Sequence, residues 1–332
     1  MKKRIIFIGI CISVAALAAL GFSLYMLRPA ERQGTDQIIV IRDGMTLGHV
    51  ADILKQEGFL EYKTPFILWA RIRGVSRKIK AGEYQLSHRM SPCKILEIII
   101  KGAVISHSVT IPEGYSSVQI ADLLVQKGLV HRLEFLALIR DPAMLERYGI
   151  DGLSLEGYIY PDTYQFGRGL SAELILDTMV KRFWQLVLPH EERVNASGMT
   201  WNEVVTLASI VEKETGLAEE RPLIASVFLN RLDKRMRLES DPTVIYGIEN
   251  FDGNLTRKDL QERTPYNTYV IRGLPPGPIA NPGLDAIMAV LNPAKTDYLY
   301  FVSRNDGSHH FSKTLSEHNR AVLKYQKRRK LN

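Results

Sequence analysis

One glutamate has the position expected of a catalytic acid. Thr200 and Glu203 form a capping-box pattern, which predicts that a helix begins there. Leu207 and Val211 then mark an apolar stripe along this helix, and Glu214 falls on the same stripe. A carboxylate on the core-facing side of a helix loses hydration, and this loss favours the protonated form and raises the pKa. The spacing therefore points to a general acid at Glu214.

Spacing alone leaves a second interpretation of Glu214 open. The residue lies in the last turn of the predicted helix, where a side chain can point into water or pair with the adjacent Lys213. The helix dipole at that end also disfavours an anion, so it too would raise the pKa. A catalytic acid and an ordinary helix-end residue are about equally compatible with this pattern.

The sequence contains only part of the motif set of serine acyl-enzymes of the penicillin-binding type. Ser91 and Lys94 fit the Ser-x-x-Lys pattern of that class. The two companion motifs are missing, because the Ser-Asp pair at Ser240 runs into Pro rather than Asn, and the Lys-Thr pair at Lys295 runs into Asp rather than Gly. Since a match of this size is expected by chance, we do not assign this chemistry.

Metal and cofactor chemistry have little support. His309, His310 and His318 lack the His-Glu-x-x-His spacing of zinc hydrolases, and His310 fits a strand. Outside the apolar N-terminal run, which contains Cys11, only Cys93 remains, so no intramolecular disulfide and no cysteine-rich metal site is expected. The sequence predicts no metal and no cofactor.

Aromatic and polar residues gather in loop-like stretches on both sides of Glu214. The stretches are 155–164, 238–246, 264–269 and 273–283. Tyrosines beside Asn, Asp and Thr in Pro- and Gly-rich loops offer flat apolar faces and rigid hydrogen-bonding groups, as a sugar-binding groove requires. Plain turns use the same residues, so the stretches are compatible with either role.

The elements before this region form an internal repeat with an offset of 70 residues. Residues 41–58 align without a gap with 111–128. Each copy predicts a strand, at 37–41 or 107–111, followed by a turn and a helix with one buried face. Gly58 and Gly128 follow these helices as candidate C-caps. A second helix is predicted in each copy, around 65–73 and 133–139.

A further strand and helix are predicted between the two copies, at 81–86 and 92–101. The resulting strand-helix-helix-strand unit has the shape of a small carbohydrate-binding module. A spacer that lifts the rest of the chain off a membrane would have the same pattern, and the pattern favours neither.

The N-terminal segment predicts a membrane anchor. No charged residue occurs from Ile5 to Leu27, and a helix of this length spans the roughly 30 Å hydrocarbon layer. The alternative is a cleaved secretory signal, for which the stretch 15–19 offers small residues. The apolar run is longer than the roughly 7–15 residues of a signal core, which favours an uncleaved anchor.

Charge near the anchor predicts its orientation. Lys2, Lys3 and Arg4 favour a cytoplasmic N-terminus, against the weaker Arg28 and Arg32 on the far side. The rest of the chain then lies outside the inner membrane, in the periplasm or its equivalent.

The net charge of +7 does not indicate a nucleic-acid partner. Residues 1–28 carry +4 and residues 321–332 carry +5, so residues 29–320 carry −2. A body that is slightly acidic lacks the basic surface that nucleic acids require. The basic tail could meet anionic headgroups or acidic wall polymers, but a solvated helix end is the slightly favoured interpretation.

Several long motifs together resemble the endolytic murein transglycosylases of the bacterial inner membrane, the MltG and YceG-like family. The resemblance covers most of the chain after the anchor and is densest from Leu155 onward. Its motifs occur in the family's order, at 156–164, 208–215, 240–247, 265–269, 273–279, 298–302, 310–312 and 317–319. One departure is Glu239, where the family often has Gln, and it bears on a substrate contact rather than on the reaction.

The resemblance implies an α+β fold with a single N-terminal transmembrane helix, a LysM-like small module and an α+β catalytic domain. The second Glu of Glu-Lys-Glu, Glu214, would be the catalytic acid. It would cleave the β-1,4 bond between N-acetylmuramic acid and N-acetylglucosamine without adding water, leaving a 1,6-anhydro end. Asp241, Tyr266 and Asn267 are then candidates for holding the glycan, and Glu156 for orienting the site.

The expected organisation follows from these patterns. A cytoplasmic N-terminus (1–4) and an anchor (5–27) are followed by a linker (28–36), the LysM-like module (37–104), a second repeat unit (105–150), the catalytic domain (151–322) and the basic tail (323–332). The expected partners are peptidoglycan glycan strands, the membrane and, by resemblance, peptidoglycan synthesis enzymes. A non-catalytic peptidoglycan-binding membrane protein is the alternative.

Overall fold

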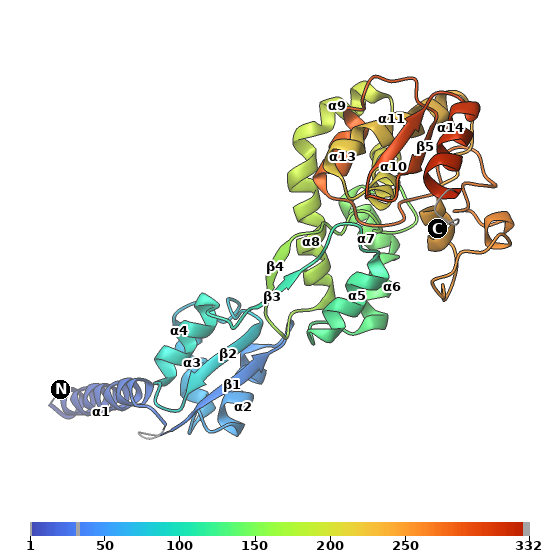
Figure 1. The fold of residues 1–332 in the computed structure, drawn as a ribbon. Coiled ribbons are helices and arrows are strands. Elements are labelled where there is room, and N and C mark those ends of the chain that lie inside the picture. Colours follow the sequence, from blue (N-terminus) through green and yellow to red (C-terminus); the bar gives the residue numbers. More distant parts are fainter. Residues whose placement is uncertain (1, 31–33, 328–332) are drawn as a thin grey trace. The chain divides into compact units, whose positions relative to one another are not determined.

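The computed structural model describes residues 2–30 and 34–327, with a mixed α+β fold that is mostly helical (Figure 1). The chain divides into two compact units. The first comprises the residues up to Ser108 together with Gln165–Ser171, and the second comprises Val109–Tyr164 together with the chain from Ala172 onward. Arg32 and three of the five basic residues of the predicted tail, Arg328, Arg329 and Lys330, lie outside the described residues.

The first unit begins with the apolar helix α1 (Lys2–Leu27). Its segment Arg4–Leu27 is long and apolar enough to cross a membrane, with a mean hydropathy of 2.7. The predicted apolar helix is therefore confirmed in extent, and both an anchor and a signal sequence are compatible with it. At its C-terminal end Met26 is buried, and the Tyr25 hydroxyl donates to the Tyr62 carbonyl at 2.8 Å and accepts from the Tyr62 N–H at 2.9 Å.

The rest of the first unit is a small two-stranded sheet with three helices. Strands β1 (Asp36–Ile41) and β2 (Gly82–Ser87) pair antiparallel, with Ile41 opposite Gly82. The helices are α2 (Leu47–Gln56), α3 (Lys63–Ile72) and α4 (Pro92–Lys101). Alternate residues of β1, Ile39 and Ile41, enter one core with the apolar faces of the helices. The predicted strand-helix-helix-strand order and the helix at 92–101 are confirmed.

The second copy of the repeat contains β3 (His107–Thr110), α5 (Ser117–Gln126) and α6 (Arg132–Ile139), followed by α7 (Pro142–Tyr148). Helices α2 and α5 begin and end 70 residues apart, which is the offset of the repeat. Gly58 and Gly128 both have the positive φ of a helix-ending glycine. The strand partner differs, because β3 pairs with β4 (Thr163–Phe166). The division between the units passes through these two strands, so most of the segment predicted as a linking unit (105–150) belongs to the second unit.

The second unit is built around α10 (Trp201–Glu214), which packs against α11 (Arg221–Asp233), α12 (Asp241–Tyr246) and α13 (Leu284–Leu291) (Figure 1). Every residue from Val204 to Val211 is buried, so α10 is surrounded rather than covered on one stripe. The predicted capping box at Thr200 and Glu203 is present and begins the helix.

The remaining elements of this unit surround that centre. They are α8 (Ala172–Val187), α9 (Glu191–Ser197), the hairpin of β5 (Tyr300–Ser303) and β6 (His309–Ser312), α14 (Leu315–Val322) and a π-helical turn (Leu323–Lys327).

Candidate active site

Glu214 is the last residue of α10 and, as a residue, is half-buried. The carboxylate oxygen Oε1 accepts a hydrogen bond from the hydroxyl of Ser240. Burial raises the pKa of Glu214 to about 7, and the negative charge of Asp241 also raises it, whereas the Ser240 hydroxyl and the charges of His309 and Arg231 lower it. A carboxyl group with this pKa exists in both protonation states near neutral pH, as acid–base catalysis requires.

Ser240 is held rigidly at the start of α12. Its side chain is buried, its N–H donates to Thr268 Oγ1 at 3.0 Å, and its carbonyl accepts from Thr243 Oγ1 at 2.7 Å. Thr243 and Thr268 share a further hydrogen bond of 2.8 Å. This network brings two of the loop-like stretches, 238–246 and 264–269, together beside Glu214.

Asp241 lies on the exposed side of the same turn. It is the first residue of α12 and accepts a hydrogen bond of 2.6 Å from the hydroxyl of Tyr269. Burial raises the pKa of Tyr269, and the hydrogen bond to Asp241 raises it further, so the phenol stays protonated and acts as a donor. Asp241 and Tyr269 together form an accessible polar edge near Glu214.

A second carboxylate, Glu220, connects the end of α10 with the C-terminal hairpin. Glu220 is buried and accepts two hydrogen bonds from His309, from its N–H at 2.7 Å and from its ring Nδ1 at 2.6 Å. It also accepts from the hydroxyl of Thr215, the residue after Glu214, at 3.4 Å. This arrangement fixes the His309 ring beside the end of the helix that carries Glu214.

Arg231 supplies a buried positive charge from α11. Its guanidinium donates to the carbonyls of Leu299 at 2.7 Å and Leu238 at 2.8 Å, and lies 5.2 Å from the Tyr300 ring centroid. These bonds hold the segment that leads to Ser240. In that segment Glu239 has a φ of 50°, a left-handed conformation that reverses the chain direction before the Ser240 turn.

Glu156 occupies a separate, fully enclosed position. It accepts hydrogen bonds from the Ser117 N–H at 2.9 Å, from Asn281 Nδ2 at 2.8 Å and from the Tyr246 hydroxyl at 3.2 Å. Burial raises its pKa to about 7, and these hydrogen bonds oppose the rise. The residue therefore ties α5, the 273–283 stretch and the last residue of α12 together.

The structure separates the roles of Tyr266 and Asn267. Tyr266 is half-buried, and its ring centroid lies 4.8 Å from that of Tyr246. Asn267 has no exposed surface; its Nδ2 donates to three carbonyls of the preceding turn, and its Oδ1 accepts from the Tyr269 N–H at 2.9 Å. Its amide is thus occupied in holding the loop, and a direct glycan contact from Asn267 would need that loop to open.

The sequence patterns predict no role for five residues that the structure places at or near this site: Ser240, Tyr269, Glu220, His309 and Arg231. Ser240 and Tyr269 do belong to motifs noted above, whereas the pattern at His309 bears only on metal binding. Among residues 2–30 and 34–327, no three His, Cys, Asp or Glu side chains are grouped so that they could hold a metal ion.

The site therefore has the form of an acid–base centre with one half-buried glutamic acid, placed where tyrosine-bearing loops meet a helix end. Comparison with known families assigns the chain more closely. Residues 39–324 match the YceG-like family, and the chain belongs to this family.

Curated relatives and a solved structure agree with this assignment. An endolytic murein transglycosylase of Bacillus subtilis is 33% identical over 90% of this chain and 88% of its own length. An endolytic murein transglycosylase of Streptococcus pneumoniae is 30% identical over 96% of this chain, which spans 64% of that longer protein. The crystal structure of a YceG-like protein from Listeria monocytogenes is 35% identical, with a TM-score of 0.60, and covers 87% of this chain and all of its own.

Proposed function

We propose that this protein is a membrane-anchored endolytic peptidoglycan lytic transglycosylase, a carbon–oxygen lyase of class EC 4.2.2.-, with Glu214 as its catalytic acid. Family membership and the names of the curated relatives support the substrate class. The observation that carries the proposal is the Glu214 carboxyl at the end of α10, which is hydrogen-bonded to Ser240 and whose pKa burial raises to about 7.

The reaction follows from the two protonation states of Glu214. The protonated carboxyl gives its proton to the oxygen of the β-1,4 bond between N-acetylmuramic acid and N-acetylglucosamine, as the bond from that oxygen to the muramyl C1 breaks. The resulting carboxylate is stabilised by the hydrogen bond from Ser240. It then takes the proton of the muramyl C6 hydroxyl, whose oxygen bonds to C1 and closes the 1,6-anhydro ring. Glu214 ends protonated, as it began.

This mechanism needs one essential carboxylate. Glycoside hydrolases use a second one as a nucleophile or to activate water, whereas here the substrate's own hydroxyl attacks. We therefore assign Asp241 to substrate positioning. Its Oδ1 accepts from Tyr269, and no hydrogen bond from the described residues reaches Oδ2, which leaves that oxygen for a sugar hydroxyl or acetamide N–H. Tyr266 offers a half-buried ring to a sugar face, whereas Glu156 and Asn267 position the loops.

The length of α1 favours an uncleaved anchor. Its apolar segment Arg4–Leu27 has 24 residues, which is longer than the roughly 7–15 apolar residues of a signal core and sufficient to span a bilayer. The two hydrogen bonds between Tyr25 and Tyr62 make the helix end part of the first unit's packing. With Lys2, Lys3 and Arg4 cytoplasmic, the two units lie outside the cytoplasmic membrane.

The remaining assignments belong to the same proposal. Residues 37–104 form the LysM-like module and 151–322 the catalytic domain. Cleavage near the membrane surface would limit the length of nascent glycan strands, with peptidoglycan synthesis enzymes as neighbours.

Product chemistry tests the proposal. The full-length chain, purified in detergent, is incubated with uncrosslinked glycan strands, and the new ends are identified by mass. We expect 1,6-anhydromuramyl ends. Reducing ends that are heavier by one water would show hydrolysis instead, and strands that are bound but uncut would support the non-catalytic binding protein.

A pair of matched variants tests the role of Glu214. Glu214→Gln keeps the shape of the side chain and removes the acid, so activity should fall by about 10²–10⁴-fold. Glu219→Gln changes an exposed carboxylate in the 3-10 turn after α10 and should leave activity unchanged. Full activity of Glu214→Gln would refute the assignment.

A further inference from the structure

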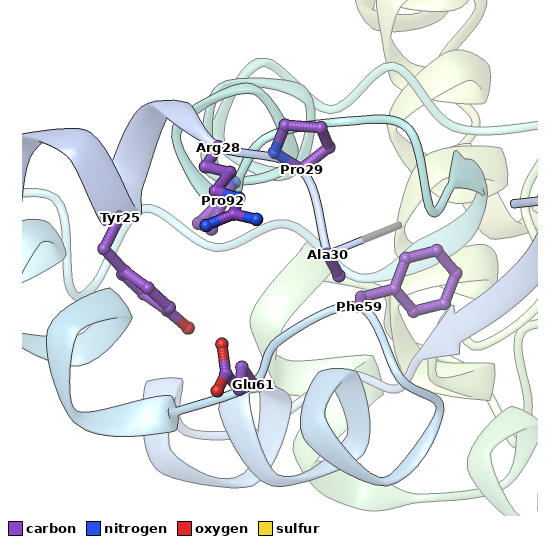
Figure 2. Close-up of a pocket in the computed structure, with 7 residues that line it drawn as sticks. All are labelled: Tyr25, Arg28, Pro29, Ala30, Phe59, Glu61 and Pro92. Atoms are coloured by element: carbon purple, nitrogen blue, oxygen red, sulfur yellow. The ribbon is translucent and has the colours of Figure 1, made fainter. Parts of the chain in front are cut away.

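A cavity of about 300 Å³ lies in the first unit, where α1 ends. Tyr25, Arg28 and Pro29 line it from the end of α1 and the residues just after it, and Glu61 lines it from the loop between α2 and α3 (Figure 2). Figure 2 shows the guanidinium of Arg28 and the carboxylate of Glu61 turned toward the same open space. The cavity is thus bounded by one cation and one anion.

The position of the cavity along α1 sets its depth relative to a membrane. The span Arg4–Leu27 has 24 residues and is about 36 Å long at 1.5 Å per residue, slightly more than the roughly 30 Å hydrocarbon layer. Arg28 and Pro29 follow immediately after this span. When α1 crosses the membrane, the cavity therefore opens at the level of the lipid headgroups on the outer side.

No ion pair within residues 2–30 and 34–327 involves Arg28 or Glu61, and both side chains are exposed. The Glu61 carboxylate lies beside the hydroxyl of Tyr62, a neutral group that leaves its negative charge in place. The cavity wall near them is fixed, because Tyr25 is held by both backbone groups of Tyr62. A ligand with one positive and one negative group could pair with both Glu61 and Arg28. A simple anion would be attracted by Arg28 but repelled by the carboxylate of Glu61.

We infer that the cavity binds the headgroup of a zwitterionic aminophospholipid. The phosphodiester lies against the guanidinium of Arg28, and the primary ammonium lies against the carboxylate of Glu61, while the acyl chains run beside α1. Guanidinium–phosphate and ammonium–carboxylate contacts are charge-assisted hydrogen bonds, which are among the strong ones in proteins. A lipid bound in this way joins the end of α1 to the loop after α2. The inference rests on the uncleaved anchor of the proposed function.

Native mass spectrometry of the full-length chain tests the inference. The delipidated protein in detergent is mixed with equal amounts of a phosphatidylethanolamine and a phosphatidylglycerol that have the same acyl chains. The wild type should retain the ethanolamine lipid about tenfold better. Glu61→Gln should bring the two lipids to within about twofold, because the ammonium loses its partner. Arg28→Gln should lower the retention of both lipids by about fivefold or more.

Matched controls and a charge swap complete the test. Lys94→Gln and Glu97→Gln alter an exposed ion pair on α4 that does not line the cavity, and both should retain the wild-type lipid preference. The double variant Arg28→Glu/Glu61→Arg should recover a preference for the ethanolamine lipid. Equal retention of the two lipids by the wild type, or an unchanged ratio in Glu61→Gln, would overturn the inference.

The same spectra separate this inference from the anchor on which it rests. The intact mass shows whether the N-terminal segment is present. A shortened chain overturns the anchor, whereas a full-length chain without lipid preference overturns only the headgroup site.

Discussion

The hydroxyl of Ser240, at the N-terminus of α12, donates a hydrogen bond to the carboxylate of Glu214, at the C-terminus of α10. The two residues are 26 positions apart in sequence, and their contact lies where two helix ends meet. Because a donor stabilises the ionised form of its acceptor, this bond holds the pKa of Glu214 below the value that burial alone would produce.

Ser240→Ala should therefore raise the pKa of Glu214 further. The protonated acid then persists to higher pH, so the alkaline limb of the pH–rate profile moves upward. The rate at the optimum should fall about tenfold, because the carboxylate formed during the reaction loses its donor. The profile of kcat/KM between pH 5 and 9 measures both effects, and Ser316→Ala at an exposed position of α14 serves as control. A downward shift of the alkaline limb would contradict the assigned direction.

Stability should depend on pH through Glu214 in a defined direction. The pKa is raised from 4.5 to about 7 in the folded protein, so the folded state binds this proton more tightly than the unfolded state. The resulting stability is fully present below pH 4.5 and is lost as the pH rises to about 7. Glu214→Gln, which cannot ionise, should be more stable than the wild type at pH 8, by about 2–3 kcal/mol.

Urea unfolding of both proteins at pH 5 and pH 8 measures this difference. The gain should be present at pH 8 and small at pH 5, where the wild-type carboxyl is protonated. A Glu214→Gln variant that is less stable than the wild type at pH 8 would contradict this prediction, because it would show that the ionised carboxylate does not destabilise the folded state.

Substitution of Glu156 should instead destabilise the fold, because this buried carboxylate accepts hydrogen bonds from Ser117, Tyr246 and Asn281. Glu156→Ala leaves the Ser117 N–H and the Asn281 amide without their carboxylate and opens a space in the core. We expect a loss of about 2–4 kcal/mol of unfolding free energy. Thermal unfolding measures it, with Glu146→Ala on the α7 surface as control. Loss of activity without loss of stability would indicate instead that Glu156 takes part in the reaction.

Much of the fold could be predicted from the sequence, because local rules determine it. The helix predicted at 92–101 is bounded by local capping signals, with Ser91 as N-cap, Pro92 in the first turn and Gly102 after the last turn. The offset between α2 and α5 follows from the repeat itself. Pairing of β3 with β4 could not be predicted, since the corresponding strand of the first copy, β1, pairs with β2, which lies between the two copies.

The candidate site was predictable only in its centre. The stripe that includes Glu214 is a local pattern of the sequence. In the structure this residue is half-buried in the second unit. Ser240 and His309 reach it from distant segments, and no spacing rule connects them with α10. The role of Asn267 could not be predicted either. An asparagine that binds a glycan and one that only stabilises its own loop have the same sequence pattern.

Glu220 and His309 should act on catalysis as a pair of positioning residues. The charge of His309 lowers the pKa of Glu214, and Glu220 fixes the ring through Nδ1. Glu220→Gln and His309→Gln should each lower kcat about tenfold, leave KM within about twofold and move the alkaline limb to higher pH. In the double variant the losses of kcat should be much less than additive. Each single substitution already breaks the hydrogen bond between Glu220 and the His309 ring. Full additivity would show that the two residues act separately.

Tyr269 should affect substrate binding more than the chemical step. Its hydroxyl donates to Asp241 at 2.6 Å, and this bond sets the direction of the carboxylate whose other oxygen is left for the glycan. Tyr269→Phe removes the donor and keeps the ring, so Asp241 is free to turn and KM should rise about three- to tenfold with kcat changed less. Asp241→Asn should raise KM similarly and, by removing a negative charge, should also lower the pKa of Glu214 and move the alkaline limb to lower pH. Steady-state kinetics on glycan strands at several pH values separate these two effects. An unchanged KM in both variants would place the glycan away from this edge of the site.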